Sequence, residues 1–111
     1  MKVREIKKDD VVILELIGRL TEGKDTDDLS EKINLKIDSG LKKLIFDLNK
    51  VHWIDSSGLG LLIRAYTRMQ KTGGELKLAR VTRSVNNLLQ MTKLTTVFAI
   101  HDTLDDASES F

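Results

Sequence analysis

The residues of this sequence that could do chemistry gather in residues 55–60, which read DSSGLG. Two serines follow an aspartate directly, and two glycines then interrupt an apolar run. Four interpretations suit residues of these types: a serine nucleophile, a phosphate-binding loop, the N-cap of a helix, or a serine that another protein modifies. The first two would make the chain an enzyme or a nucleotide-binding protein, and the last two would not.

An enzymatic site needs partners that the sequence does not supply. A serine nucleophile requires a base held by a third group, and the stretch is not the G-x-S-x-G of hydrolases. The only histidines are His52 and His101, and His52 lies four residues before Ser56. The phosphate loop G-x-x-x-x-G-K-[ST] is absent, and no set of His, Cys or carboxylate residues has the spacing of metal ligands. We therefore expect no catalysis, no cofactor and no bound metal.

The two remaining interpretations concern the start of a helix. Asp55 or Ser56 can act as an N-cap, accepting hydrogen bonds from the first free N–H groups. A glycine inside a helix costs about 0.8–1.0 kcal/mol relative to alanine, so Gly58 and Gly60 argue against a cap alone. Their benefit would be close approach of a neighbouring strand or of a partner's surface. The residue types leave the structural cap and the accessible serine both open.

Strands and helices alternate along the chain. Apolar and β-branched runs predict two strands within residues 3–20 joined by a turn at 7–10, then strands at 44–48, 75–81 and 96–100. Helices are expected where apolar residues recur at helical spacing, in four groups: Leu29, Ile33 and Ile37; Leu59, Leu62, Ile63, Tyr66 and Met69; Val85, Leu88 and Leu89; Leu104, Ala107 and Phe111. Such alternation predicts parallel strands joined by right-handed crossovers, with the first hairpin as an antiparallel edge.

Composition bounds the kind of protein. The 111 residues are 41% hydrophobic and 32% charged, as in an ordinary folded domain, and residues 1–111 are expected to form one domain. The net charge of +1 predicts neither nucleic-acid nor membrane binding. No cysteine is present, the apolar runs are too short to span a membrane, and the first ten residues lack a signal peptide's apolar core. A cytoplasmic location is therefore expected.

Four segments together resemble the STAS domain, and more narrowly the bacterial anti-sigma factor antagonists. They are LIGRL (16–20), LIFDLNKVHWIDSSGLGLLI (44–63), GGELKLARVTRSVNNLLQMTKL (73–94) and VFAIHDT (97–103). The resemblance covers nearly the whole chain. It implies an α/β fold: a mixed, mostly parallel sheet of four to five strands, with about four helices mainly on one face.

The resemblance also implies a function without intrinsic catalysis. An antagonist of this kind binds a kinase-like anti-sigma factor, which then releases its sigma factor. The same partner, a serine kinase, uses ATP to phosphorylate the serine after the motif's aspartate, which is Ser56 here. The phosphorylated antagonist no longer holds the partner, and a metal-dependent serine phosphatase resets it.

The resemblance places the partner-binding face on the loops at 18–25 and 55–60. In the second loop, Asp55 would orient the loop or aid the phosphotransfer geometry, and Ser57 would be structural. Gly58, Leu59 and Gly60 would belong to the docking surface. In the first loop, the family often has an acidic residue at the position of Thr21. We expect the neighbouring Glu22 to substitute for it.

Other features have weaker interpretations. Trp53 is expected to pack in the core or at a strand end, and Met69 and Met91 are expected to fill the core. Six basic residues are expected to lie on a solvated face: Arg64, Arg68, Lys71, Lys77, Arg80 and Arg83. Two other functions remain as alternatives. One is a STAS scaffold subunit of a stress-sensing or transporter-associated assembly, and the other is a nucleotide-binding or weakly enzymatic domain. The sequence leaves monomer and weak dimer equally open.

Overall fold

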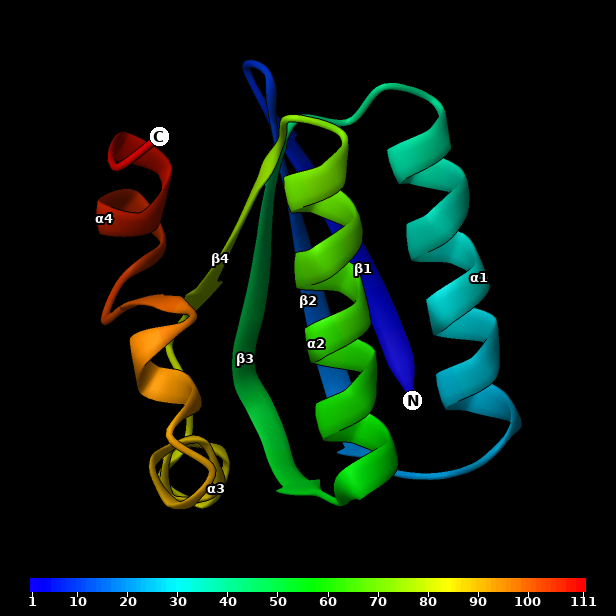
Figure 1. The fold of residues 1–111 in the computed structure, drawn as a ribbon, viewed down its shortest axis with the longest axis vertical. Coiled ribbons are helices and arrows are strands. Elements are labelled where there is room, and N and C mark those ends of the chain that lie inside the picture. The colour runs from blue at the N-terminus through cyan, green and yellow to red at the C-terminus, as the bar shows by residue number, and fades with distance from the viewer.

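Five strands form one mixed sheet in the order β1-β2-β3-β4-β5 (Figure 1). The computed structural model describes all residues from 1 to 111. The strands are β1 (Lys2–Lys8), β2 (Val11–Leu20), β3 (Lys43–Ile54), β4 (Glu75–Ala79) and β5 (Ala99–His101). β1 pairs with β2 in the antiparallel sense, and the other neighbours are parallel. The predicted mixed and mostly parallel sheet is confirmed, with five strands.

Four helices cover this sheet, chiefly on one face. They are α1 (Lys24–Asp38), α2 (Ser56–Lys71), α3 (Arg83–Met91) and α4 (Leu104–Glu109), with a short 3-10 helix at Leu94–Thr96. Figure 1 shows α1 and α2 side by side over the sheet. α3 adds Val85 and Leu89 to the core beneath them, whereas α4 packs Ala107 onto the opposite face. The predicted one-sided arrangement is confirmed, with α4 as the exception.

The period of two along the strands produces these two cores. In β3, Leu44 and Phe46 face the large core under α1 and α2, while Ile45 faces the smaller core under α4. In β2, Leu14 likewise faces the large core and Ile13 faces the smaller one. Because β2 and β3 are buried on both faces over this length, they read in sequence as continuous apolar runs.

β3 is longer than the predicted strand at 44–48 and continues to Ile54. Two irregularities in its register with β2 break the alternation that the prediction relied on, one between Glu15 and Ile17 and one between Gly18 and Arg19. The extra length brings residue 55 to the carboxyl end of β2. The DSSGLG stretch therefore begins at the edge of the sheet, where the parallel strands end.

Trp53 lies at the end of β3, one of the two places expected for it, but it is not packed there, and the predicted burial of Met91 is wrong. Trp53 is 62% exposed, because the second register irregularity keeps Val51 and Ile54 on the core side and turns Trp53 outward. Met91 is 81% exposed, since it lies two residues after the buried Leu89 and so on another side of α3. Burial of Met69 in the large core is confirmed.

The last strand and the short helices also differ in detail from the predictions. β5 begins at Ala99, not at residue 96, because residues 94–96 form the 3-10 helix and Phe98 enters the core. Thr82 precedes α3, but its hydroxyl donates to the carbonyl of Val51 instead of capping the helix. Thr103 caps α4 by accepting a hydrogen bond from the N–H of Asp106.

The six basic residues do not share one solvated face. Arg68 pairs with Asp38 of α1, whereas Lys77 is buried on the other side of the sheet, against the ring of Phe111. Arg80 pairs with carboxylates of the central strands. No helix of the structure combines the length and the apolar character that crossing a membrane requires.

Candidate functional site

Asp55 joins the two loops that the sequence predicted to act together. Its backbone is extended, and its Oδ1 accepts a hydrogen bond of 3.0 Å from the N–H of Gly58, which makes Asp55 the N-cap of α2. Its Oδ2 accepts a second bond of 3.1 Å from the N–H of Glu22, in the loop after β2. Both bonds lower the pKa of the Asp55 carboxyl because they favour its ionised form, and the bond from Gly58 has the larger effect. One ionised side chain therefore fastens the 21–23 loop to the start of α2.

Gly58 is required by the packing of α2 against β2. A Cβ atom at this position would lie 2.0 Å from the carbonyl oxygen of Leu20 and 2.9 Å from the side chain of Ile54. The absent side chain lets the first turn of α2 approach the end of β2. The sequence suggested that a glycine here would allow close approach of either a neighbouring strand or a partner. Gly58 allows close approach of a neighbouring strand.

Gly60 lies in a different environment, one and a half turns into α2. A Cβ atom there would meet only the guanidinium of Arg64, whose Nη1 would be 3.0 Å away. That group is the end of a flexible side chain, so the fold itself does not require a glycine at this position. The packing of the fold therefore does not account for the helical cost of Gly60.

Ser56 carries the accessible hydroxyl of the site. It is the first residue of α2 and is exposed, while Ser57, Leu59 and Gly60 are half-buried and Gly58 is buried. No hydrogen bond within the chain engages the Ser56 hydroxyl, which is therefore free to meet another molecule. No histidine or carboxylate holds Ser56 as the base of a catalytic triad would.

The 21–23 loop is held in place by its own contacts. The hydroxyl of Thr26 donates to the carbonyl of Thr21, and the N–H of Asp55 donates to the carbonyl of Leu20. Thr21 is half-buried and Glu22 is exposed. The structure therefore brings both predicted residues of this loop next to the start of α2, with Glu22 presenting the free carboxylate.

Sequence reasoning missed two neighbours of this site. Arg64 was grouped with the basic residues, although its spacing of four residues from Gly60 and eight from Ser56 is a signal for one side of a helix. Trp53 was expected to pack in the core or at a strand end, but it is exposed and lines a shallow groove with Leu88 and Met91 between the end of β3 and α3. No signal in the sequence marked the register irregularity that exposes it.

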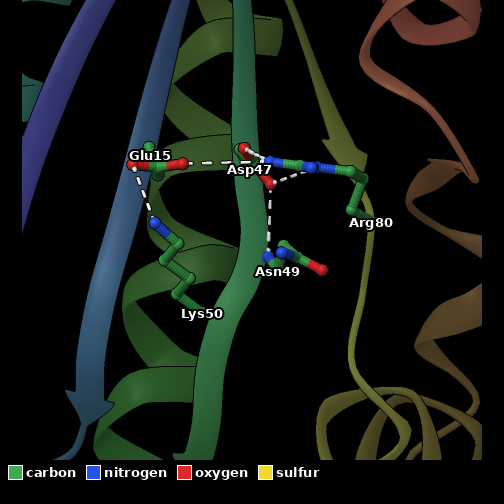
Figure 2. Close-up of polar contacts among 5 residues, drawn as sticks. All are labelled: Glu15, Asp47, Asn49, Lys50 and Arg80. Carbon is green, nitrogen blue, oxygen red and sulfur yellow. Dashed lines mark hydrogen bonds and ion pairs between the residues drawn. The ribbon is translucent and has the colours of Figure 1, made fainter.

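A second polar cluster lies on the other face of the sheet (Figure 2). Arg80 binds Asp47 through two hydrogen bonds and lies 3.8 Å from Glu15, which in turn lies 4.0 Å from the ammonium group of Lys50. Its hydrogen bond to Asp47 raises the pKa of Arg80. Both carboxylates are buried and both have a cation, so the cluster links β2, β3 and the end of β4. The structure gathers no three His, Cys, Asp or Glu side chains placed to hold a metal ion.

The strand order, the antiparallel first hairpin and the capped helix that presents an exposed serine define a small α/β module of the STAS class. The STAS domain model matches residues 3–107, and the chain belongs to this family. The residues quoted above for the resemblance lie within the match.

A relative in this family is named for its role in regulation. An anti-sigma F factor antagonist from Paenibacillus polymyxa is 27% identical over 97 residues, which are 83% of this chain and 79% of that protein. The name of this relative describes an antagonist of an anti-sigma factor.

Solved structures agree with the fold. A candidate anti-sigma factor antagonist from Thermotoga maritima has 25% identity and a TM-score of 0.88, over 96% of this chain and 92% of that one. The unphosphorylated anti-sigma factor antagonist SpoIIAA has 20% identity and a TM-score of 0.84, over 97% and 94% of the two chains. The likeness to SpoIIAA concerns the fold alone.

Proposed function

We propose that this chain is an anti-sigma factor antagonist, a cytoplasmic protein-binding module that phosphorylation of Ser56 switches off. The observation that carries the proposal is the exposed, unengaged hydroxyl of Ser56 at the start of α2, directly after the capping Asp55. The names of the relatives support the general function. SpoIIAA, a protein of the same fold, is known in both a phosphorylated and an unphosphorylated form.

The partner in this proposal is an anti-sigma factor with serine kinase activity. It transfers the γ-phosphoryl group of ATP to Oγ of Ser56 and releases ADP. A serine phosphatase then hydrolyses the phosphoester and restores the binding form. The unphosphorylated chain sequesters the kinase, and the phosphorylated chain leaves it free to hold its sigma factor.

The contact face consists of the two loops that Asp55 fastens together. Thr21 and Glu22 supply one side, and Ser57, Leu59 and Gly60 supply the other. Gly58 belongs to the face by its position only, since it is buried against Leu20 and shapes the turn from below. Glu22 provides the exposed acidic group of the first loop.

Electrostatics favour a switch that acts on binding and spares the fold. A phosphate adds about −1.5 to −2 charges at pH 7, and the free N–H groups of a helix N-terminus tolerate such a charge. A bound partner would have to desolvate that phosphate next to Asp55. The charge therefore costs much more in the complex than in the free module.

The proposal is tested by affinity capture from a lysate of the host organism with added ADP, followed by mass spectrometry. The baits are the wild-type chain, Ser56→Ala and Ser56→Asp. We expect Ser56→Ala to retain a small kinase-like protein and Ser56→Asp to lose it. Equal capture of the same assembly by all three baits would contradict the switch. Ser56 would then have only a structural role in the helix, and the scaffold alternative would be favoured.

A further inference from the structure

Ser56, Gly60 and Arg64 lie toward one side of α2, each turned about 40° around the helix axis from the one before. They are spaced four residues apart, so successive members are separated by about 6 Å along the helix axis. Helical side chains lean toward the N-terminus of their helix. Arg64 does so here, and its guanidinium lies over Gly60, with Nη1 3.0 Å from the place where a Cβ of Gly60 would be. The guanidinium therefore points along the helix toward Ser56.

Arg64 has no partner within the chain. No carboxylate lies within 4.0 Å of its guanidinium, and it makes no hydrogen bond. The next arginine of the helix behaves differently, because Arg68 pairs with Asp38 of α1 at 2.5 Å. The Asp55 carboxylate, next to Ser56, already accepts two backbone N–H bonds. A cation thus extends toward Ser56 with its hydrogen-bonding capacity unused.

We propose that Arg64 is the internal partner of the phosphate on Ser56, and that residue 60 is a glycine so that the guanidinium can reach across it. The inference rests on the proposed modification of Ser56. A side chain at residue 60 would displace the guanidinium from its present place, whereas glycine leaves that place open. A planar guanidinium can hold two phosphate oxygens at once, which suits a group confined to one side of a helix.

This pairing has a consequence for the switch. In the unphosphorylated chain the Arg64 cation is free, beside the half-buried Leu59 and Gly60 of the contact face. In the phosphorylated chain the same cation is occupied by the phosphate. Phosphorylation therefore changes the contact face twice, by adding an anion at Ser56 and by withdrawing a cation at Arg64.

The experiment uses the full chain with phosphoserine installed genetically at residue 56, so that it depends on no kinase. Phosphorus NMR follows the titration of the phosphate. We expect Arg64→Gln to raise its second pKa by roughly 0.2–0.7, the range of an exposed ion pair. Arg68→Gln, which removes an arginine already paired with Asp38, is the matched control and should leave the pKa unchanged. Arg64→Lys should fall between wild type and Arg64→Gln, because it keeps the charge and loses the planar fork.

Other charged groups at this edge of the sheet are the same in all these proteins. They are Arg19, Glu22, Lys24 and Asp55. Their influence cancels in the comparison, so a difference in phosphate pKa between wild type and Arg64→Gln is caused by the loss of Arg64. Arg64 is exposed, and circular dichroism should show an unchanged fold in each variant. Equal phosphate pKa values in wild type, Arg64→Gln and Arg68→Gln would overturn the inference.

Failure of this inference can be told apart from failure of the proposed function. If Ser56→Asp loses the partner but Arg64→Gln leaves the phosphate pKa unchanged, the switch stands and the internal pairing is wrong. If Arg64 lowers the phosphate pKa but all three baits capture the same proteins, the pairing stands and the switch is wrong.

Discussion

Arg80 reaches back from the end of β4 to hold Asp47 on the neighbouring strand. Its Nε donates to Oδ1 at 3.1 Å and its Nη2 donates to Oδ2 at 2.6 Å (Figure 2). The backbone of Arg80 is left-handed, with φ of 53°, which few non-glycine residues adopt. Asp47 is buried directly opposite the buried Glu15, so two carboxylates share the middle of the sheet. The guanidinium offsets their charge.

Removing this guanidinium should destabilise the protein. We expect Arg80→Met to lower the free energy of unfolding by about 1–3 kcal/mol, because Asp47 and Glu15 would remain buried with one fewer cation. The part of Arg80 that is exposed to solvent keeps the figure below that of a fully buried pair. Urea denaturation at pH 7 measures the change. Arg83→Gln, at an exposed arginine without an ion pair, is the control, and an equal loss in both variants would contradict the prediction.

The two glycines of the motif should respond oppositely to alanine. Gly58→Ala should destabilise the fold by about 1–3 kcal/mol or more, because the new Cβ would lie 2.0 Å from the carbonyl oxygen of Leu20. Gly60→Ala should stabilise it by about 0.5–1 kcal/mol, since the Cβ displaces only the end of Arg64 and the helix gains a better helix former. Thermal unfolding of both variants gives the two signs. The prediction fails if both variants shift the midpoint in the same direction.

Asp55 should make the stability depend on pH. Its folded pKa is lowered by the N–H bonds from Gly58 and Glu22, so its contribution is fully present above its unfolded pKa of about 3.9. The contribution is lost as pH falls through the folded pKa. Asp55→Asn can still cap α2 but carries no charge. The stability advantage of wild type over Asp55→Asn should therefore be constant near neutral pH and shrink below about pH 4.

Denaturation at a series of pH values measures that difference. The lowered pKa values of Glu5, Asp10 and Asp25 are present in both proteins and cancel in the comparison. A difference that stays constant down to pH 2 would show that Asp55 acts without its charge.

Charge at residue 56 should leave the fold intact. Ser56→Asp and Ser56→Ala should have similar circular dichroism spectra, because residue 56 is exposed and lies where the free N–H groups of α2 tolerate an anion. A collapsed spectrum of Ser56→Asp alone would refute this tolerance, and with it the idea that the switch acts on binding only.

Most of the fold could be predicted because its signals are local. The continuous apolar run at residues 11–14 marked an interior strand, and Leu29, Ile33 and Ile37 marked the buried side of α1. Asp55 could be predicted as one of two possible caps because the preference depends on residue type. Trp53 could not be placed, since its exposure depends on a register irregularity between two strands that are far apart in sequence.

Contacts between distant residues were equally out of reach. Arg80 and Asp47 are 33 positions apart, and they meet only because β3 and β4 lie in parallel register and Arg80 turns left-handed. The bond from the N–H of Glu22 to Asp55 also joins residues 33 positions apart, and it depends on where β2 ends. The sequence marked Glu22 and Asp55 as members of one face but contained no sign of the bond itself.

That bond has a consequence for how a partner would be met. The carboxylate of Asp55 joins two surface segments, the 21–23 loop and the start of α2, in addition to the backbone bond from the N–H of Asp55 to the carbonyl of Leu20. A protein that docks on them would find the surface already assembled, and little conformational entropy would be lost on association. The lifetime of the complex would then depend on the fit between two rigid surfaces, and loosening the bond between Glu22 and Asp55 would shorten it.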